Sequence, residues 1–355
     1  MSEAGLLELR NKLDNIDNEL LKLINERMEI VHQVGVIKAH SGGAIYRPER
    51  EKAIIDRLES LNDGKLNRAA IEALFLEIFA ISRNLELPEN VAYLGPEGSF
   101  THQAAEGRFG AMSSYVSIGS IKGIFREVAT SKARFGVVPI ENSSNGIVTD
   151  TINCLNEYNL KIIAEVVLDI HHTLASTCDK IEDIKRIYSK DIAFEQCRKF
   201  LANFGLDEVE HIPIESTTKA AKIAVNEPGS AAICPHVGAK LHNLPILFEN
   251  IEDKDNNKTR FFIISNFENA QSGNDKTSIL VTLSDKQGAL VDFLTDFNKM
   301  NINLTKIKSH IVEGNSIFFI DFDGHKDDDN VKDVLSKYED NIKILGSYVK
   351  EINDI

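Results

Sequence analysis

One apolar pattern near the N-terminus limits the possible folds of this chain more than any other feature. Apolar residues alternate at spacings of three and four from Leu6 to Ile37, and Arg27 alone interrupts them. This spacing predicts one long helix that packs in coiled-coil fashion. A helix of ~35 residues would be ~50 Å long, which exceeds the width of a domain of ~86 residues. The helix must therefore pack on something outside itself, and a second copy of the chain is the simplest partner.

The length and the polar breaks predict three domains. A chain of 355 residues is too long for one ordinary core. Polar stretches at 87–90 and 268–276 separate segments of different composition. We expect an all-helical domain over residues 1–86, a two-lobed α/β domain over 91–267, and a smaller α+β domain over 277–355.

Charge and cysteine usage exclude several classes of function. A net charge of −14 argues against nucleic-acid or anionic-membrane binding. The four cysteines have neither metal-ligand nor disulfide-framework spacing. We see no leader pattern and no apolar run of the ~18 residues needed to cross a bilayer, so we expect a cytoplasmic protein without a metal. A pocket for an anionic substrate must then gather its own Arg and Lys, which makes basic residues in motifs informative.

All three predicted helices of the first segment carry polar groups on an otherwise apolar face. The second helix should begin near Pro48 and place Glu51 on that face, and the third should begin near residue 67. Lys38 follows Arg27 by three turns at nearly the same angle, so both can face one pocket. An alternative is a structural ion pair between Arg27 and Glu51 with boundary residues at the helix ends. Because three helices share the feature, we favour a pocket.

Three strings in the middle segment read as ligand loops on strands. They are GPEGSFTHQAA (95–105), GVVPIENSSNG (136–146) and KTRFFIIS (258–265). A strand-to-helix turn such as the first can point backbone N–H groups at an anion, but a plain turn without a ligand is at least as good an interpretation of this string taken alone. The second ends a buried strand in a dense group of side-chain donors, which favours a ligand loop over a simple helix cap.

These strings resemble the signature loops of the prephenate dehydratase family, whose fold is similar to that of periplasmic binding proteins. The resemblance implies that Thr259 is the residue most closely tied to catalysis, as an oriented donor to the leaving oxygen. It also implies substrate contacts from Glu141, Asn142, Ser143, Thr149, His172 (or its neighbour His171), Ser216, Thr217, Arg260 and Phe261. Arg260 could instead only pair with the acidic run Glu252, Asp253 and Asp255. Lys190 stands where the family often has a histidine, and it either replaces that residue's contacts or lies outside the site.

The helical segment resembles the all-helical chorismate mutase domain, an intertwined homodimer. The resemblance implies that Arg10 reaches across the dimer and that Lys38 donates to the ether oxygen. The other implied pocket residues are Arg27, Arg47, Arg50, Glu51, Ser82 and Glu86. Arg forks hold carboxylates in fixed geometry, which suits a rearrangement that needs only a folded dicarboxylate. Glu86 stands where many members have Gln, and an ionised Glu cannot donate a hydrogen bond, so we expect mutase activity to fall as pH rises.

The C-terminal segment predicts a ferredoxin-like order of elements, βαββαβ. We expect strands at 277–283, 304–312, 315–323 and 342–350, with helices near 288–300 and 328–340. The segment resembles the ACT regulatory domain, in which Gly288, Ala289 and Leu290 form the loop that closes over an amino acid. Ser309 falls in the second effector loop, where Lys308 and His310 replace the family's Glu and Arg. We expect phenylalanine to regulate with altered affinity or selectivity.

Together these resemblances predict a bifunctional chorismate mutase and prephenate dehydratase that makes phenylpyruvate for phenylalanine synthesis. It would act on chorismate and prephenate as a homo-oligomer, without a cofactor. One alternative is a dehydratase whose helical domain serves only dimerisation, which need not keep the four cations Arg10, Arg27, Lys38 and Arg50. The other is a non-catalytic amino-acid sensor, which has no use for Thr259.

Overall fold

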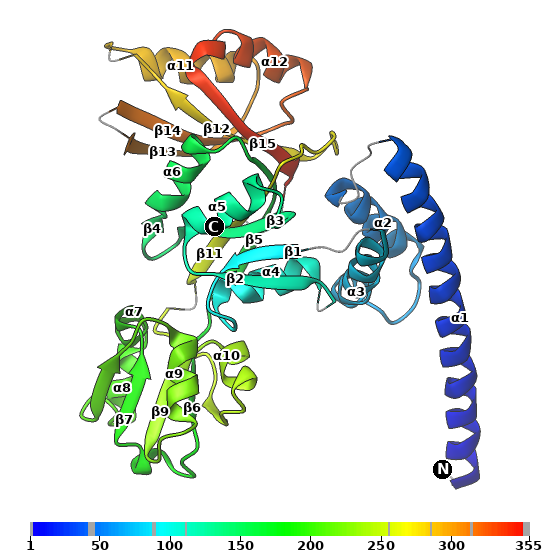
Figure 1. Cartoon of the computed structure of the whole chain (residues 1–355), viewed down its shortest axis with the longest axis vertical. Coiled ribbons are helices and arrows are strands. Elements are labelled where there is room, and N and C mark those ends of the chain that lie inside the picture. Colours follow the sequence, from blue (N-terminus) through cyan, green and yellow to red (C-terminus); the bar gives the residue numbers. More distant parts are fainter. Residues whose placement is uncertain are drawn as a thin grey trace. The chain divides into compact units, whose positions relative to one another are not determined.

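The computed structural model describes residues 3–41, 47–86, 90–110, 112–254, 256–284, 286–312 and 315–350. The chain forms two compact units (Figure 1). The helical unit contains Met1–Glu89 together with Phe109–Ser114, and the α/β unit contains Asn90–Arg108 together with Tyr115–Ile355.

The helical unit consists of α1 (Glu3–Ser41), α2 (Pro48–Leu61) and α3 (Arg68–Glu86). Pro48 occupies the first turn of α2, where its missing N–H has no intrahelical partner to lose, so the predicted start is confirmed. A small core of Ile55, Ile71 and Phe79 joins α2 to α3. The long helix is also confirmed, and its seam is uncovered in the single chain: Leu13 is 58% exposed and Ile30 is 61% exposed. Among the described helices, none combines the length and the apolarity that a bilayer span requires.

The α/β unit begins with two lobes, each built on its own sheet. The first sheet has the order β2-β1-β3-β11-β5, and β4 pairs with β3. Its strands are β1 (Asn90–Leu94), β2 (Ser114–Ile118), β3 (Phe135–Asn142), β4 (Gly146–Ile147), β5 (Lys161–Asp169) and β11 (Lys258–Ser265). Its helices are α4 (Phe100–Phe109), α5 (Ile121–Ala129) and α6 (Thr149–Glu157). The chain leaves this lobe after β5 and returns to its centre in β11, as expected for a two-lobed domain.

The second lobe has a five-stranded sheet with the order β10-β6-β9-β7-β8. Its strands are β6 (Thr173–Ser176), β7 (Arg186–Ser189), β8 (Glu210–Pro213), β9 (Ser230–Cys234) and β10 (Ile246–Phe248). Its helices are α7 (Asp191–Gln196), α8 (Arg198–Asn203), α9 (Thr217–Ala224), α10 (His236–Leu241) and the short 3₁₀ helix Ile181–Asp183. A cluster of small residues, including Ala220, Ala232 and Ala239, lets these helices pack closely on the sheet.

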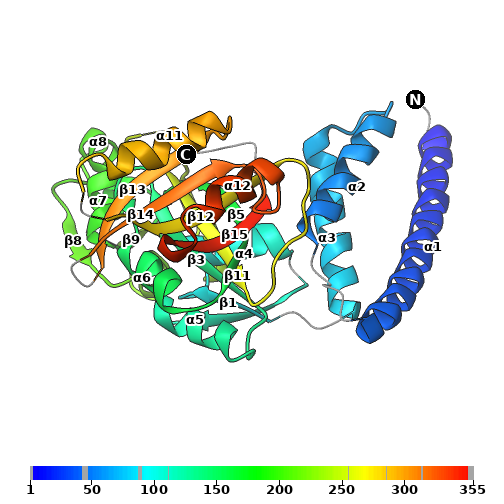
Figure 2. The ribbon, with the colours of Figure 1, turned by 90° about the horizontal axis from the view of Figure 1, so that it is seen from above.

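The third sheet confirms the predicted βαββαβ order, with the strand order β13-β14-β12-β15. Its strands are β12 (Asp275–Thr282), β13 (Leu304–Val312), β14 (Asn315–Asp323) and β15 (Ile342–Val349). Its helices are α11 (Ala289–Lys299), α12 (Asp329–Ser336) and the 3₁₀ helix Glu339–Asn341. Both α helices lie on one face of the sheet (Figure 2), where Phe293, Phe297 and Val334 pack against it.

The other face of the third sheet packs on the first lobe. One apolar cluster contains Phe262 and Ile264 of the first lobe together with Phe319 and Tyr348 of the third sheet. Strand β15 approaches β5 so closely that a Cβ on Gly346 would lie 2.1 Å from the backbone oxygen of Ile162. Glycine is therefore required there. The two sheets share one core, and they belong to the same compact unit.

Candidate active sites

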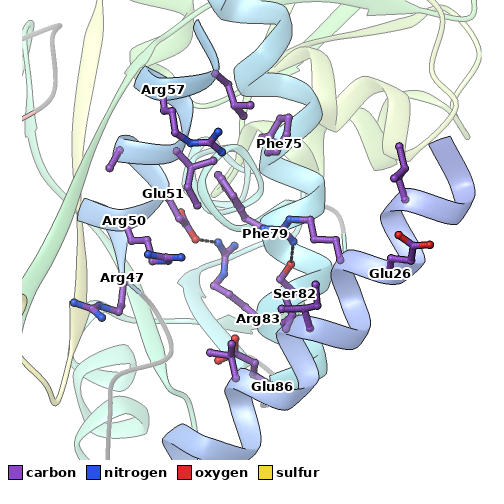
Figure 3. A pocket seen from close by; sticks show the side chains of 18 residues that line it. Glu26, Arg47, Arg50, Glu51, Arg57, Phe75, Phe79, Ser82, Arg83 and Glu86 are labelled. Atoms are coloured by element: carbon purple, nitrogen blue, oxygen red, sulfur yellow. Dashed lines mark hydrogen bonds and ion pairs between the residues drawn. The ribbon is translucent and has the colours of Figure 1, made fainter. Parts of the chain in front are cut away.

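The three helices of the helical unit enclose a pocket of about 820 Å³ (Figure 3). Its lining is rich in arginine, with apolar walls that include Phe75 and Phe79. Of the residues predicted from the sequence, the pocket brings together Arg27, Arg47, Arg50, Glu51, Ser82 and Glu86. Arginine guanidinium groups above an apolar floor suit a small ligand that carries carboxylates.

Arg27 is fixed at the wall by α3. Its Nη1 donates to Ser82 Oγ at 2.6 Å, and that hydroxyl donates to the Ile78 carbonyl at 2.6 Å. The guanidinium also lies 5.8 Å from the centre of the Phe79 ring. Burial and the nearby charge of Arg50 lower the pKa of Arg27. The pocket therefore concentrates positive charge that an anionic ligand would relieve.

Glu51 pairs with Arg83 rather than with Arg27. The Arg83 guanidinium is buried and donates to Glu51 and, at 3.2 Å, to the Phe109 carbonyl. The alternative of an Arg27–Glu51 ion pair is therefore not found: Arg27 contacts Ser82, and Glu51 pairs with the next residue of α3. Arg83 and Arg57 are pocket residues that the sequence reading missed. Arg57 follows Arg50 by two turns of α2, and this spacing was a usable signal.

The remaining mutase positions differ in what the structure says of them. Arg10 is exposed on α1 and is not among the described residues that line its own chain's pocket. Lys38 lies in α1, but its side chain falls outside the described residues. At Gly35, where α1 passes α3, an added Cβ would lie 3.1 Å from Glu86 Cγ. This glycine lets the two helices approach beside Glu86.

A second cavity, of about 390 Å³, lies in the α/β unit between its two lobes. The first lobe contributes residues 95–101, which lead into α4, together with the last residue of β3 and the first residues of β11. The second lobe contributes the starts of α7 and α9. Of the predicted residues it brings together Asn142, His172, Ser216, Thr217, Thr259 and Phe261. Lys190 also lines it, so the loop that carries this residue does not lie outside the cleft. The polar lining also includes Ser99, Thr101, Asn145, Gln196, Glu215 and Asn257.

Asn142 orients the Thr259 hydroxyl. Its Nδ2 donates to Thr259 Oγ1 at 2.9 Å and to Asn257 Oδ1 at 2.9 Å. Its Oδ1 accepts the backbone N–H groups of Ser144 and Asn145 at 3.0 and 3.1 Å. Because the Thr259 oxygen is already an acceptor, its own proton is available to a ligand in the cleft.

His172 is a neutral, buried imidazole. Burial lowers its pKa, although the hydrogen bond with Gln196 opposes the shift. With the Gln196 side-chain oxygen as assigned, Nε2 carries the proton and donates to it at 2.8 Å. Nδ1 then presents a lone pair, and it has no hydrogen-bond partner among the described residues. The neighbouring His171 is half exposed and pairs with Glu252 at 2.6 Å, so of the two candidates His172 is the one in the cleft.

Four predicted dehydratase residues lie outside the set of described side chains that line the cleft: Glu141, Ser143, Thr149 and Arg260. Ser143 Oγ donates to the Asn256 carbonyl at 3.0 Å, and Thr149 is the first residue of α6. Glu141 forms ion pairs with Lys306 and Lys308 of β13. Alternation along β3 explains this placement, because the side chain before Asn142 must point to the opposite face.

Arg260 is buried against the third sheet. Its guanidinium contacts Glu165 of β5 at 2.7 Å, Asp321 of β14 at 2.5 Å and the Tyr348 hydroxyl of β15 at 2.9 Å. Burial acts to lower the pKa of Arg260, but its contacts with the Tyr348 oxygen and the carboxylates of Asp321 and Glu165 raise it. The alternative partners Glu252 and Asp253 are therefore replaced by Glu165 and Asp321, while Asp255 lies outside the described residues.

The predicted effector positions lie on two elements of the third sheet. Gly288 precedes α11 with φ +87°, a conformation that favours glycine, and Ala289 and Leu290 open that helix. Ser309 is exposed on β13. Within the described parts of the chain, no group of three or more His, Cys, Asp or Glu side chains could hold a metal ion.

Comparison with known proteins finds the same three parts in the same order. Family models described as chorismate mutase type II, prephenate dehydratase and ACT domain match residues 9–87, 91–269 and 277–340. Relatives named bifunctional chorismate mutase/prephenate dehydratase are 38% identical in Aquifex aeolicus and 40% identical in Pseudomonas aeruginosa, each over 98% of both chains. A solved prephenate dehydratase from Arthrobacter aurescens in complex with L-Phe is 31% identical. It covers 74% of this chain and 90% of its own, with a TM-score of 0.68.

Proposed function

This chain belongs to the family of bifunctional chorismate mutase/prephenate dehydratases, and on that premise we propose that it converts chorismate to phenylpyruvate in phenylalanine biosynthesis. The observation that carries the proposal is that one chain holds both an arginine-lined helical pocket and a cleft in which Asn142 orients Thr259. We assign the mutase to residues 1–86, the dehydratase to 91–267 and the regulatory domain to 277–355.

In the mutase pocket, the arginines would hold the substrate in its reactive conformation. The rearrangement of chorismate breaks one carbon–oxygen bond and forms one carbon–carbon bond within a single molecule, without a proton transfer. Arg27 and Arg50 would hold the two carboxylates and so keep the reacting carbon atoms close. Glu51 would accept from the substrate hydroxyl, and Lys38 would donate to the ether oxygen as negative charge grows there.

In the dehydratase cleft, prephenate loses carbon dioxide and its 4-hydroxyl, which leaves as water, and aromatisation drives the step. The Thr259 hydroxyl would donate a hydrogen bond to the departing oxygen. Lys190 and the N-termini of α4 and α9 border the cleft and would attract the two carboxylates. The lone pair of His172 Nδ1 would accept a hydrogen bond from the substrate. Neither step calls for a metal or an organic cofactor.

We also propose that the protein is a cytoplasmic homodimer or larger oligomer regulated by L-phenylalanine. The uncovered apolar seam of α1 supports the dimer, and it would bring the partner's copy of Arg10 to a pocket that its own chain leaves without it. The ACT domain supports amino-acid regulation, with Gly288, Ala289, Leu290 and Ser309 as the proposed contacts. The replacements at Lys308 and His310 predict an altered affinity or selectivity.

The deciding experiment gives the purified protein chorismate alone, without any added cofactor, and follows prephenate and phenylpyruvate over time. We expect prephenate to appear first and phenylpyruvate to follow. If only added prephenate is converted, the helical unit serves dimerisation alone. If neither compound changes, the sensor alternative gains and the catalytic assignment is wrong.

A further inference from the structure

Strands β3 and β11 divide their two faces between the cleft and the third sheet. In β11, Thr259 and Phe261 line the cleft, while Arg260 and Phe262 point to the third sheet. In β3, Asn142 reaches the cleft and Glu141 reaches Lys306. Alternation along a strand produces this division. The strand backbone that carries the catalytic side chains is therefore also fixed by contacts between its opposite face and the third sheet.

Four charged side chains meet on that rear face. Glu141 is opposite Arg260 in the β3–β11 register, and Lys306 is opposite Asp321 in the β13–β14 register. Lys306 pairs with Glu141, and Arg260 pairs with Asp321, so the signs alternate around the group. We call Glu141, Arg260, Lys306 and Asp321 the charge square. Glu165, Lys276, Lys308 and Tyr348 border it.

Burial restricts how far the side chains of the charge square can move apart. Arg260 is 2% exposed, Asp321 is 1% exposed and Glu141 is 7% exposed, while the side chain of Lys306 is partly buried at 17% exposed. In such surroundings the attraction between opposite charges is strong, and leaving one charge without its partner is costly. The side chains must therefore keep close contact, and the backbones that carry them are held in one relative position.

The next registered pair along the same two strands is Asn142 with Thr259. Each residue of this catalytic pair directly follows or precedes a member of the charge square. A shift of Glu141 is therefore transmitted through one peptide unit to Asn142, and from its amide to the Thr259 hydroxyl. A displacement of about 1 Å in a reacting group can cost on the order of a hundredfold in rate.

We propose that the Glu141–Lys306 pair positions the Asn142–Thr259 pair, so that dehydration of prephenate depends on a side chain of the regulatory sheet. Lys306 is a positioning residue, since it contacts Glu141 and acts on the substrate through Asn142 and Thr259. This inference rests on the proposed dehydratase activity. The alternative is that the pair only attaches the third sheet to the first lobe.

The test compares two lysine variants at the same junction between sheets. Lys306→Met removes the nearer partner of Glu141 and leaves Lys308, whose Nζ lies 3.8 Å from the other carboxylate oxygen. Lys326→Met removes a more exposed ion pair, in which Lys326 Nζ contacts Glu268 2.6 Å away and Glu268 likewise keeps a second lysine, Lys161. Neither Lys326 nor Glu268 neighbours Asn142 or Thr259. The substrate is prephenate, and the mutase rate of the same chain serves as an internal control.

We expect Lys306→Met to lower the dehydratase kcat about ten- to a hundredfold with little change in KM. Lys306→Arg, which keeps the charge, should restore most of the rate. Lys326→Met should keep the wild-type kcat, and the mutase rate should stay unchanged in all three variants. Glu141→Gln should lower kcat at least as much as Lys306→Met, because it also ends the ion pair with Lys308. The double variant should lose no more than Glu141→Gln alone, because the Lys306 interaction is already absent there.

Equal dehydratase rates in Lys306→Met and Lys326→Met would overturn the inference, as would a loss confined to KM. If both lysine variants lose dehydratase activity in proportion to a lowered thermal stability, the result supports the alternative, in which the ion pair only attaches the third sheet to the first lobe. Wild-type protein that fails to convert prephenate would refute the proposed function, an outcome distinct from either of these.

Discussion

At the scale of single residues, the hydrogen bond that the Thr259 oxygen already accepts determines where its own proton can point. Asn142 Nδ2 donates to it at 2.9 Å, which directs the hydroxyl proton away from Asn142. Thr259→Val keeps the shape of the side chain and removes the donor. We expect its dehydratase kcat to fall on the order of 10²- to 10³-fold, as for loss of one transition-state hydrogen bond.

Thr259→Ser is the matched control, because it keeps the hydroxyl and loses only a methyl group. Its rate should stay within about tenfold of wild type, since methyl loss changes packing more than hydrogen bonding. Steady-state assays with prephenate give kcat and KM for each protein. A Thr259→Val enzyme as fast as Thr259→Ser would contradict the assigned role.

His172 links the cleft to acid stability. Burial lowers its pKa below the ordinary value of 6.5 in the folded chain, so only the unfolded chain gains a proton as pH falls through that value. The folded state should lose up to about 1.4 kcal/mol for each pH unit between 6.5 and the lower folded pKa, and nothing above this range.

His172→Gln removes the imidazole and keeps a polar side chain. Thermal unfolding of both proteins between pH 5 and 7.5 should show a wild-type transition that falls more steeply on acidification than that of the variant. Parallel curves across this range would mean that His172 titrates normally in the folded protein.

At the scale of helices and strands, periodicity predicted the elements well. It predicted poorly which side chains of different elements contact one another. The bounds of β13 and β14 agree with the expected strands, and α2 begins at Pro48 as expected. Alternation also required Glu141 and Arg260 to leave the cleft if their neighbours entered it. What the sequence alone could not supply was which face of β11 the third sheet would cover, since the buried apolar run Phe261–Ile264 places apolar side chains on both faces.

The same limit explains why the alternative of an Arg27–Glu51 ion pair named the wrong partner for Glu51. Helical spacing placed Glu51 and Arg27 on facing surfaces, but Arg83 lies one residue beyond Ser82 and reaches Glu51 first. A difference of one residue on a helix turns the side chain by about 100°, and the packing of α2 on α3 decides which side chain is nearer. Pairwise contacts between helices depend on such crossings, which periodicity does not fix.

The crossing of α1 over α3 depends on Gly35, and two glycine variants test this. Gly35→Ala would bring a Cβ within 3.1 Å of Glu86 Cγ, so we expect Glu86 to shift and mutase activity to fall several-fold. Gly107→Ala in α4 meets no atom within 4 Å and should raise stability by about 0.5–1 kcal/mol through helix propensity alone.

Mutase kinetics and thermal unfolding distinguish the two variants. Dehydratase activity should be unchanged in Gly35→Ala. If Gly35→Ala instead gains stability and keeps its mutase rate, as an ordinary helical Gly→Ala change would, the close approach at Glu86 does not matter for activity.

At the scale of the whole molecule, Arg10 predicts that two chains share each mutase pocket. Arg10→Ala and Arg27→Ala should each abolish most mutase activity. In a mixed dimer, one pocket would combine the intact Arg27 of one chain with the intact Arg10 of the other. Co-expression with two different tags and isolation of the mixed species should therefore recover up to about half of the wild-type rate.

The dehydratase rate and the size of each species by light scattering are the controls. Both single variants should keep the dehydratase activity and the wild-type oligomer. No recovery in isolated mixed dimers would mean that Arg10 acts within its own chain or has no part in the pocket.

The close approach of β15 to β5 at Gly346 also bears on how genes for such proteins can be recombined. Three family models divide the chain, but it forms only two compact units, because the dehydratase and ACT segments share one core. Cutting the chain near residue 270 would expose Phe262 and leave Arg260 without Asp321. Exchange of regulatory domains between relatives would therefore require matching both surfaces of this junction, however freely the coding segments can be joined.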